Sequence, residues 1–398
     1  SGGSIGGNVY GASVPKTSGT ADVTQNTAEI SGGSIGGSVY GGQNVGTGNA
    51  DQNNVKLSGG SIAGSVYGGY AAGSGSAKDN SITITGGSIG HDIYGGYAAH
   101  GKTTGNTVNI GDGSHALSAG TSIVGTIYGG NQADVKDNTL NVKTNATAGN
   151  IAGFAKIKFE LNGSLNSAQP MLRLTNGAAT TGLDWAGVEA APMPSHVTVK
   201  TYEPYQLTLM HNNAGLNFVQ GGKDTYAPIG AKERVQGNLE FVIDTDSHAA
   251  QARSVYLSGY QFQNNTGAAY TAADGTHSAA WGGRTAVGNT VTNNKLTVSG
   301  GSLTDAAYGG LVENHKRNAG GALPTGDAVK NTVILSSGAN AAAVYGADVR
   351  TRAGSASENR AEISGGSVTG NVYGAALSAD NASGSATQNT AKVSGGSI

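Results

Sequence analysis

The feature that most constrains this chain is a short word, Val/Ile-Tyr-Gly or a close variant, that recurs along it. Its tyrosines stand at Tyr10, Tyr40, Tyr67, Tyr94 and Tyr128, and again at Tyr308, Tyr345 and Tyr373. Neighbouring copies within each group are 27 to 37 residues apart. Self-similarity at such a period is typical of repeat architectures, in which each unit buries its apolar face against the next unit.

Each repeat carries two short stretches with strand patterning. Apolar and polar residues alternate before each Gly-Gly-Ser word, as in residues 28–30 (Ala-Glu-Ile), and a second stretch follows it, as in residues 35–39 (Ile-Gly-Gly-Ser-Val). Because alternate residues of a strand share a face, Ile35 and Val39 are expected inside and Glu29 outside.

Stacking of such units predicts the fold. Identical coils place apolar side chains on apolar side chains, and 27 to 37 residues accommodate one coil and a variable loop. Each coil should rise by about 4.8 Å, the spacing between neighbouring strands. Because parallel strands joined by crossovers wind right-handedly, we predict an all-β, right-handed parallel β-helix, or β-solenoid.

The repeats divide the chain into three stretches. Regular solenoid repeats are predicted for residues 1–150 and 286–398. Between them, in residues 151–285, the word fades, although alternating strand patterns persist. This middle stretch is either a divergent part of the solenoid, which we favour, or an inserted all-β region. The same five-residue word stands at residues 1–5 and 394–398, so we expect a segment of a longer protein.

Composition narrows the classes of function. Only 12% of the residues are charged, and the formal net charge is -2. No basic patch offers an electrostatic footprint for nucleic acid, so we expect no nucleic-acid partner. No apolar run reaches the roughly 18 residues of a membrane span, so this segment is not expected to insert into a membrane. The absence of cysteine fits an exported protein that is stiffened by its backbone ladder.

Two recurring side chains are predicted to form ladders along the stack. Asparagines precede the first strand of the repeats at Asn26, Asn53, Asn80, Asn106, Asn138, Asn294, Asn331, Asn359 and Asn389. Stacked Asn side chains can hydrogen-bond from coil to coil, so we favour a structural ladder over glycan or ion contact. The tyrosines of the repeat word form the second set, for which we favour packing over the binding of sugar rings.

No catalytic, cofactor-binding or metal site is predicted. An enzyme on this fold needs ionisable residues that converge on one face, and the best pair, Asp244 and Asp246, is interpreted as a polar strand end. The eight histidines lack metal-ligand spacing. The Gly pairs are not followed by the Lys-Ser/Thr word of a phosphate loop, and the Gly/Asp repeat of calcium-stacked solenoids is missing.

Residues 30–42, Ile-Ser-Gly-Gly-Ser-Ile-Gly-Gly-Ser-Val-Tyr-Gly-Gly, and their variants resemble the Gly/Ser-rich repeats of autotransporter passenger domains and related large surface adhesins of Gram-negative bacteria. The resemblance covers residues 1–145 and 285–398. It implies an extracellular parallel β-helix at the bacterial cell surface, either secreted or anchored in the outer membrane. Host or bacterial surface molecules or glycans would be its partners, and no cofactor or site residue is carried over.

The sequence thus predicts a non-catalytic solenoid that acts as the stalk and adhesive surface of a bacterial adhesin. The alternative is a structural segment of an extracellular filament, in which copies of the chain associate end to end because unpaired strand edges attract further strands. A polysaccharide-degrading β-helix enzyme is a third, more distant possibility. It would require acidic residues of the middle stretch to converge in a groove.

Overall fold

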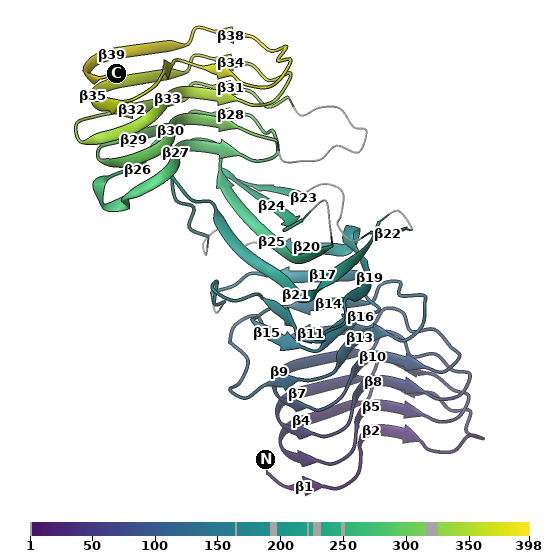
Figure 1. Cartoon of the computed structure of the whole chain (residues 1–398). Coiled ribbons are helices and arrows are strands. Elements are labelled where there is room, and N and C mark those ends of the chain that lie inside the picture. Colours follow the sequence, from purple (N-terminus) through teal and green to yellow (C-terminus); the bar gives the residue numbers. More distant parts are fainter. Residues whose placement is uncertain are drawn as a thin grey trace. The chain divides into compact units, whose positions relative to one another are not determined.

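A computed structural model describes residues 2–163, 165–191, 197–220, 223–225, 232–247, 251–314 and 325–398. Its parallel strands stack into a β-solenoid of about 13 turns, which confirms the predicted fold class (Figure 1). The coils group into two compact units: unit 1 comprises Ser1–His196, Leu207–Pro228 and Thr245–Tyr256, and unit 2 comprises Val197–Gln206, Ile229–Asp244 and Leu257–Ile398. Over the described ranges, no helix is long and apolar enough to span a membrane.

Two walls of parallel strands build the regular part of unit 1. The first wall contains, in order, β1 (Ser4–Ile5), β4 (Thr27–Ile35), β7 (Asn54–Ile62), β9 (Ser81–Ile89), β11 (Thr107–Ile110), β14 (Thr139–Val142), β17 (Lys156–Glu160) and β20 (Val188–Ala191), with β12 (Ser122–Ile123) also on β9. The second contains β2 (Val9–Val14), β5 (Val39–Asn44), β8 (Val66–Ala71), β10 (Ile93–Ala98), β13 (Thr126–Gly130) and β16 (Asn150–Ala152). A short pair, β3 (Val23–Thr24) and β6 (Ala50–Asp51), lies outside these walls.

The pattern becomes less regular after β14. Strands β15 (Ala146–Ala148), β18 (Leu172–Leu174) and β21 (Tyr205–Gln220) pair in parallel, as do β19 (Thr180–Asp184) and β21. A 3₁₀ turn, η1 (Trp185–Gly187), precedes β20. Strand β22 (Lys223–Thr225) pairs with β21 in the antiparallel direction. Parallel coils therefore continue past residue 150, with a departure from parallel pairing at β22.

Unit 2 returns to regular coils. One sheet follows the order β26 (Ala268–Tyr270), β29 (Lys295–Val298), β32 (Thr332–Leu335), β35 (Arg360–Val368), β33 (Ala339–Val349), β30 (Gly301–Val312) and β27 (Thr276–Thr285), with β39 (Thr390–Ser397) on β35 and both β36 (Val372–Tyr373) and β37 (Ala376–Leu377) on β33. A second sheet contains β28 (Val291–Thr292), β31 (Ala328–Val329), β34 (Ala356–Ser357) and β38 (Ala386–Thr387).

The remaining elements of the middle stretch are shorter or less regular. Strands β23 (Lys232–Gln236) and β24 (Leu239–Thr245) form an antiparallel hairpin, β25 (Ala252–Gln261) follows, and η3 (Ala272–Asp274) is a 3₁₀ turn. The hairpin adds strands that are not wound as solenoid coils. The sequence does not reveal it, since its alternating pattern is the same as that of a coil strand.

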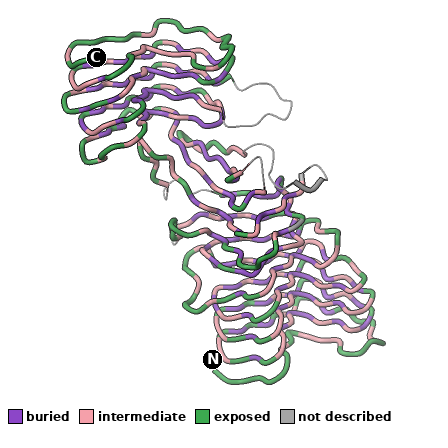
Figure 2. The backbone as a smooth tube through the Cα atoms, in the orientation of Figure 1, coloured by how far each residue is buried: buried purple, intermediate pink, exposed green. Residues whose placement is uncertain are grey.

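In-register pairing makes the core a set of apolar ladders. In the second wall of unit 1, Val39, Val66, Ile93, Ile127 and Ile151 pair one after another, and none is more than 1% exposed. Each such side chain stabilises the fold by about 1.5–3 kcal/mol relative to an exposed one. Figure 2 shows the buried residues following the strands, while exposed residues gather at the loops.

We expect Val39→Asp to destabilise unit 1 by about 4 kcal/mol, because it places an unpaired charge at a fully buried position. Glu29→Gln on the exposed face of β4 should change stability by no more than about 0.5 kcal/mol. Thermal unfolding followed by circular dichroism measures both variants. Equal losses of stability would contradict the assignment of inner and outer faces.

Candidate functional site

The asparagines of unit 1 lie in one hydrogen-bonded ladder. The Oδ1 atom of Asn53 accepts from both the backbone N–H and the Nδ2 of Asn26, at 3.1 and 3.0 Å. The same two bonds recur from Asn53 to Asn80, from Asn80 to Asn106 and from Asn106 to Asn138. The last four members are no more than 1% exposed. Their amides are therefore used within the stack rather than presented to a ligand.

Unit 2 contains the second ladder. The same pair of hydrogen bonds recurs along Asn294, Asn331, Asn359 and Asn389, with distances of 2.9 to 3.0 Å between Nδ2 and the Oδ1 of the next asparagine. The other Nδ2 hydrogen of Asn331 goes to the carbonyl of Val291. The structure adds Asn265 to the asparagines predicted from the sequence, since its backbone N–H donates to Asn294 Oδ1. The spacing of 29 residues between Asn265 and Asn294 matches the repeat and could have identified it.

The ladder explains two other features of the repeat. The residue before a ladder asparagine adopts a left-handed conformation, as Gln52, Asp79 and Lys330 do with φ of 56° to 58°. The second glycine of Tyr-Gly-Gly faces the ladder amide, because a Cβ added to Gly69 would lie 2.5 Å from Asn80 Nδ2. Gly69 thus allows a close approach to the ladder, although Ala347 stands at the equivalent position in unit 2. The αL corner, which costs roughly 1–2 kcal/mol, is held by the ladder.

We expect Asn80→Ala to lower the free energy of unfolding by about 2–4 kcal/mol. It leaves the buried Asn53 N–H and Nδ2 groups without their acceptor. The matched control is Asn54→Ala, one residue beyond ladder member Asn53, because that side chain is only half-buried. Denaturant titration compares the free energy of unfolding of the two variants with that of the parent chain. Equal losses in the two variants would contradict a stabilising role of the asparagine ladder.

The tyrosines of unit 1 form a face-to-face stack. Successive ring centroids along Tyr10, Tyr40, Tyr67, Tyr94 and Tyr128 are 5.0, 4.9, 5.1 and 4.7 Å apart, with interplanar angles of at most 13°. This spacing is the rise of one coil, so in-register pairing itself sets the ring separation. Burial raises the pKa of Tyr40 to about 12. The Tyr40 hydroxyl therefore remains neutral at physiological pH.

A second, shorter tyrosine stack stands beside the first. The rings of Tyr70 and Tyr97 are 4.9 Å apart and nearly parallel. They meet the first stack edge-on, since the Tyr97 ring lies at 87° to the Tyr94 ring at 5.5 Å. Such T-shaped contacts are favourable for aromatic rings. Together the two stacks form an aromatic strip on unit 1. The tyrosines predicted from the repeat word make up only part of this strip, because Tyr70 and Tyr97 are not among them.

The aromatic strip ends at a hollow in unit 1. This hollow has a volume of about 810 Å³, and its lining includes Tyr94, Tyr97, Tyr128, Ala152 and Asp184. In the coil after Tyr128, the paired residue is Ala152, so the stack has no further ring there. Aromatic, aliphatic and carboxylate groups thus meet in one place that the repeat pattern alone does not mark.

The tyrosines of unit 2 stack in the same way. Centroids of Tyr308, Tyr345 and Tyr373 are 5.2 and 4.8 Å apart, and Trp281 pairs in register with Tyr308. The Arg350 guanidinium lies 5.6 Å from the Tyr308 ring centre and donates to its hydroxyl at 2.8 Å. The stack in unit 2 therefore borders charged groups.

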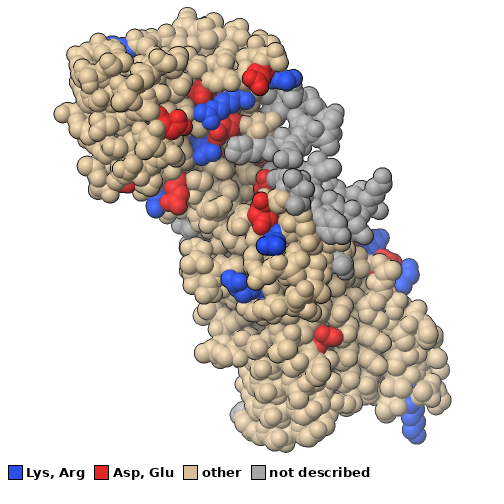
Figure 3. Space-filling view, in the orientation of Figure 1, with Lys and Arg blue, Asp and Glu red and all other residues tan. Residues whose placement is uncertain are grey.

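Those charges form a connected network in unit 2. Arg350 pairs with Asp348 at 2.8 Å and with Glu313 at 3.0 Å, and Glu313 also pairs with Arg284 at 2.8 Å. The Arg284 guanidinium lies over the ring of Trp281, 4.6 Å from its centre. Each charge has an opposite partner, which offsets the cost of partial burial. Figure 3 shows how sparse charged side chains are on the face in view.

Among the described residues, the most deeply buried acid is Glu240, which is 0% exposed. It accepts hydrogen bonds from the Thr285 hydroxyl, the Ala286 N–H and the Asn289 amide, and Asn289 also donates to Glu233. Burial raises the pKa of Glu240, against the lowering effect of these donors. Two carboxylates are thus bridged by one amide, a pair that the sequence did not single out. Because Glu240 is enclosed, its carboxylate presents no face to a substrate.

We expect the stability of unit 2 to fall as pH rises above about 4.5, the ordinary pKa of glutamic acid. In that range the folded state still holds the Glu240 proton that the unfolded chain has released, so folding becomes less favourable. Glu240→Gln removes this titration, and its melting temperature relative to the parent should therefore rise with pH. Exposed Asp380→Asn is the control and should follow the parent. A pH-independent difference for Glu240→Gln would contradict the raised pKa.

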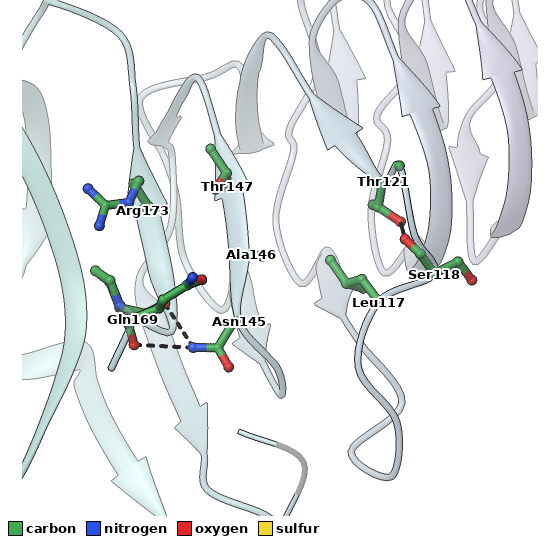
Figure 4. A pocket seen from close by; sticks show the side chains of 10 residues that line it. Leu117, Ser118, Thr121, Asn145, Ala146, Thr147, Gln169 and Arg173 are labelled. Carbon is green, nitrogen blue, oxygen red and sulfur yellow. Dashed lines mark hydrogen bonds between the residues drawn. The ribbon is translucent and has the colours of Figure 1, made fainter. Parts of the chain in front are cut away.

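A smaller polar pocket of about 230 Å³ lies in unit 1 (Figure 4). Asn145 lines it, but its Nδ2 already donates to the carbonyls of Asn166, Gln169 and Pro170, and its Oδ1 accepts from the N–H of Asn166. Arg173 is the one charged side chain among its lining residues. The amide organises the loop, so the pocket offers a ligand little beyond a single guanidinium.

The acidic pair considered from the sequence falls in two different units. Asp246 Oδ1 accepts from the backbone N–H groups of Arg253 and Ser254, at 2.9 and 3.1 Å, as a turn-closing residue does. Asp244 belongs to unit 2. Among the histidines, His196, His248 and His315 lie outside the described residues. Within the described ranges, no three His, Asp or Glu side chains group as metal ligands would.

Comparison with known protein families, curated proteins and solved structures gives no match. The fold and the side-chain geometry therefore carry the functional argument.

Proposed function

We propose that this chain is a non-catalytic extracellular β-solenoid of a bacterial surface adhesin, in which it acts as a stalk and exposes an adhesive surface. The observation that carries the proposal is the pair of asparagine ladders. Their bonds run from coil to coil, so these buried polar interactions resist separation of the coils. That is the mechanical requirement of a stalk.

The surface chemistry supports the adhesive part of the proposal. Half-buried tyrosines line the strip on unit 1, and tyrosine offers a rigid apolar face together with a hydroxyl group. The resemblance of residues 30–42 to autotransporter passenger repeats supports the extracellular setting. The low charge content argues against partners that are recognised by long-range electrostatics.

The alternative function is a structural segment of an extracellular filament. Identical words pair with each other in the stack, as Ser4 with Ser34 and Ile5 with Ile35. A coil of a second copy would present the same register, so intermolecular stacking would repeat an interaction that already exists within the chain. A polysaccharide-degrading enzyme is not favoured, because Glu240, which shares the Asn289 amide with Glu233, is fully buried.

Adhesion of coated beads tests the proposal. Beads that carry the chain should adhere under flow to bacterial or epithelial cells more strongly than albumin-coated beads, and soluble chain should compete. Electron microscopy of the soluble chain should then show separate particles. Filaments that lengthen with protein concentration would favour the structural alternative. Absence of both adhesion and filaments would overturn both functions.

A further inference from the structure

The two tyrosine stacks of unit 1 both end at the hollow. Tyr128 stacks on Tyr94 on one side, and Ala152 occupies the position of the next ring on the other. Tyr97 stacks on Tyr70, whereas in the following coil Asn131 turns its amide to the backbone N–H and carbonyl of Ala98. Among the described residues, no further ring stacks on Tyr97 or Tyr128 on this side. Each stack therefore ends on a ring that borders the hollow, which Ala152 and Phe154 also line.

The hollow has the dimensions of a ligand site. Its volume of about 810 Å³ lies in the range of about 300–1,000 Å³ that small-ligand sites occupy. Successive ring centroids in the stack are 4.7 to 5.1 Å apart. The next position beyond Tyr128 therefore has the height of one further ring in the stack. A flat ring with an apolar face would extend the stack by one member.

The polar groups around the hollow are mainly hydrogen-bond acceptors. Asp184 uses Oδ1 to accept from the N–H of Ala186, and its Oδ2 has no protein partner among the described residues. Gln132 donates through its amide nitrogen to the Ala98 carbonyl, which leaves its Oε1 as an acceptor. The hydroxyls of Tyr97 and Tyr128 can both accept and donate. A ligand rich in hydroxyl donors matches this set.

The charge of the lining residues distinguishes neutral from acidic ligands. Asp184 is the only charged residue among the described residues that line the hollow, and no Lys or Arg lines it. A uronic or sialic acid would place its carboxylate near Asp184 without a cation to offset the repulsion. A neutral sugar carries hydroxyl donors and no opposing charge.

We propose that this hollow binds a pyranose unit of a neutral polysaccharide, stacked on the open face of Tyr128. The apolar C–H face of the sugar covers the ring, and its hydroxyls donate to Asp184 and Gln132. Tyr97 provides a second open ring for a neighbouring sugar unit. This site rests on the proposed adhesive function, since it gives the adhesive surface a ligand class.

The decisive variant fills the site with the protein's own ring. Ala152→Tyr places a tyrosine in register with Tyr128, as Tyr128 is with Tyr94, so the variant should fold and retain or raise the melting temperature. It should weaken binding of neutral oligosaccharides by at least about tenfold. Tyr128→Ala should weaken it to a similar extent, because it removes the stacking face. Tyr345→Ala, in the unit 2 stack, is the matched control and should leave binding unchanged.

Isothermal titration with cellohexaose, maltohexaose and hexa-N-acetylchitohexaose, and with hexagalacturonate as an acidic counterpart, measures these effects. We expect at least one neutral hexamer to bind more tightly than hexagalacturonate. Binding that persists in Ala152→Tyr would overturn the site, as would tighter binding of hexagalacturonate or no binding of any neutral hexamer. If N-acetyltyrosinamide bound at this position and the sugars did not, the ligand would be an aromatic peptide and the sugar assignment would be wrong.

Bead adhesion separates failure of this site from failure of the proposed function. If beads coated with Ala152→Tyr adhere as strongly as the parent and no neutral hexamer binds, the adhesin function stands and the sugar site is wrong. If parent beads adhere to no cell surface while cellohexaose binds at Tyr128, the sugar site stands and the adhesive role is wrong.

Discussion

The hydrogen bond from one ladder asparagine to the next is the interaction on which the regular coils depend. One Oδ1 atom accepts both the backbone N–H and the side-chain amide of the neighbouring coil, as between Asn53 and Asn80. This arrangement fits the coil height that strand pairing sets, and it holds the strained corner residue before the asparagine. A side chain on Gly69 would collide with the amide of Asn80, whereas Ala347 stands at the equivalent position of a later coil. The coil-to-coil hydrogen bond and the left-handed corner residue are thus parts of one arrangement.

The most informative surfaces lie where the repetition stops. The first asparagine ladder ends at Asn138, whose amide donates to the carbonyls of Thr103 and Gly153. The tyrosine stack ends at Tyr128, within the same part of unit 1. A regular solenoid covers every ring with the next ring, so only an interruption leaves an aromatic face open beside a hollow. In this way an irregularity in the repeat creates a surface that the repeat itself cannot provide.

Unit 2 contains partly buried charged groups in addition to its ladders. Arg284, Glu313, Arg350 and Asp348 form a network in which each charge is paired, and aromatic rings flank the guanidinium groups. Glu240 is the exception, because its carboxylate is held by neutral donors alone. Such groups add directional polar contacts to the apolar and amide ladders of this unit.

The sequence by itself determined the solenoid, because the recurrence of Val/Ile-Tyr-Gly and the alternation of residues such as 28–30 require stacked parallel strands. It also located the residues that the structure brings into the asparagine and tyrosine ladders, since in-register stacking turns a sequence period into a spatial contact. Only the tertiary structure placed Glu233 and Glu240 around Asn289, added the β23–β24 hairpin, and set Ala152 above Tyr128. No repeat period relates Glu233, Glu240 and Asn289, and Ala152 interrupts the tyrosine series. These positions therefore depend on how irregular loops and strands pack in three dimensions.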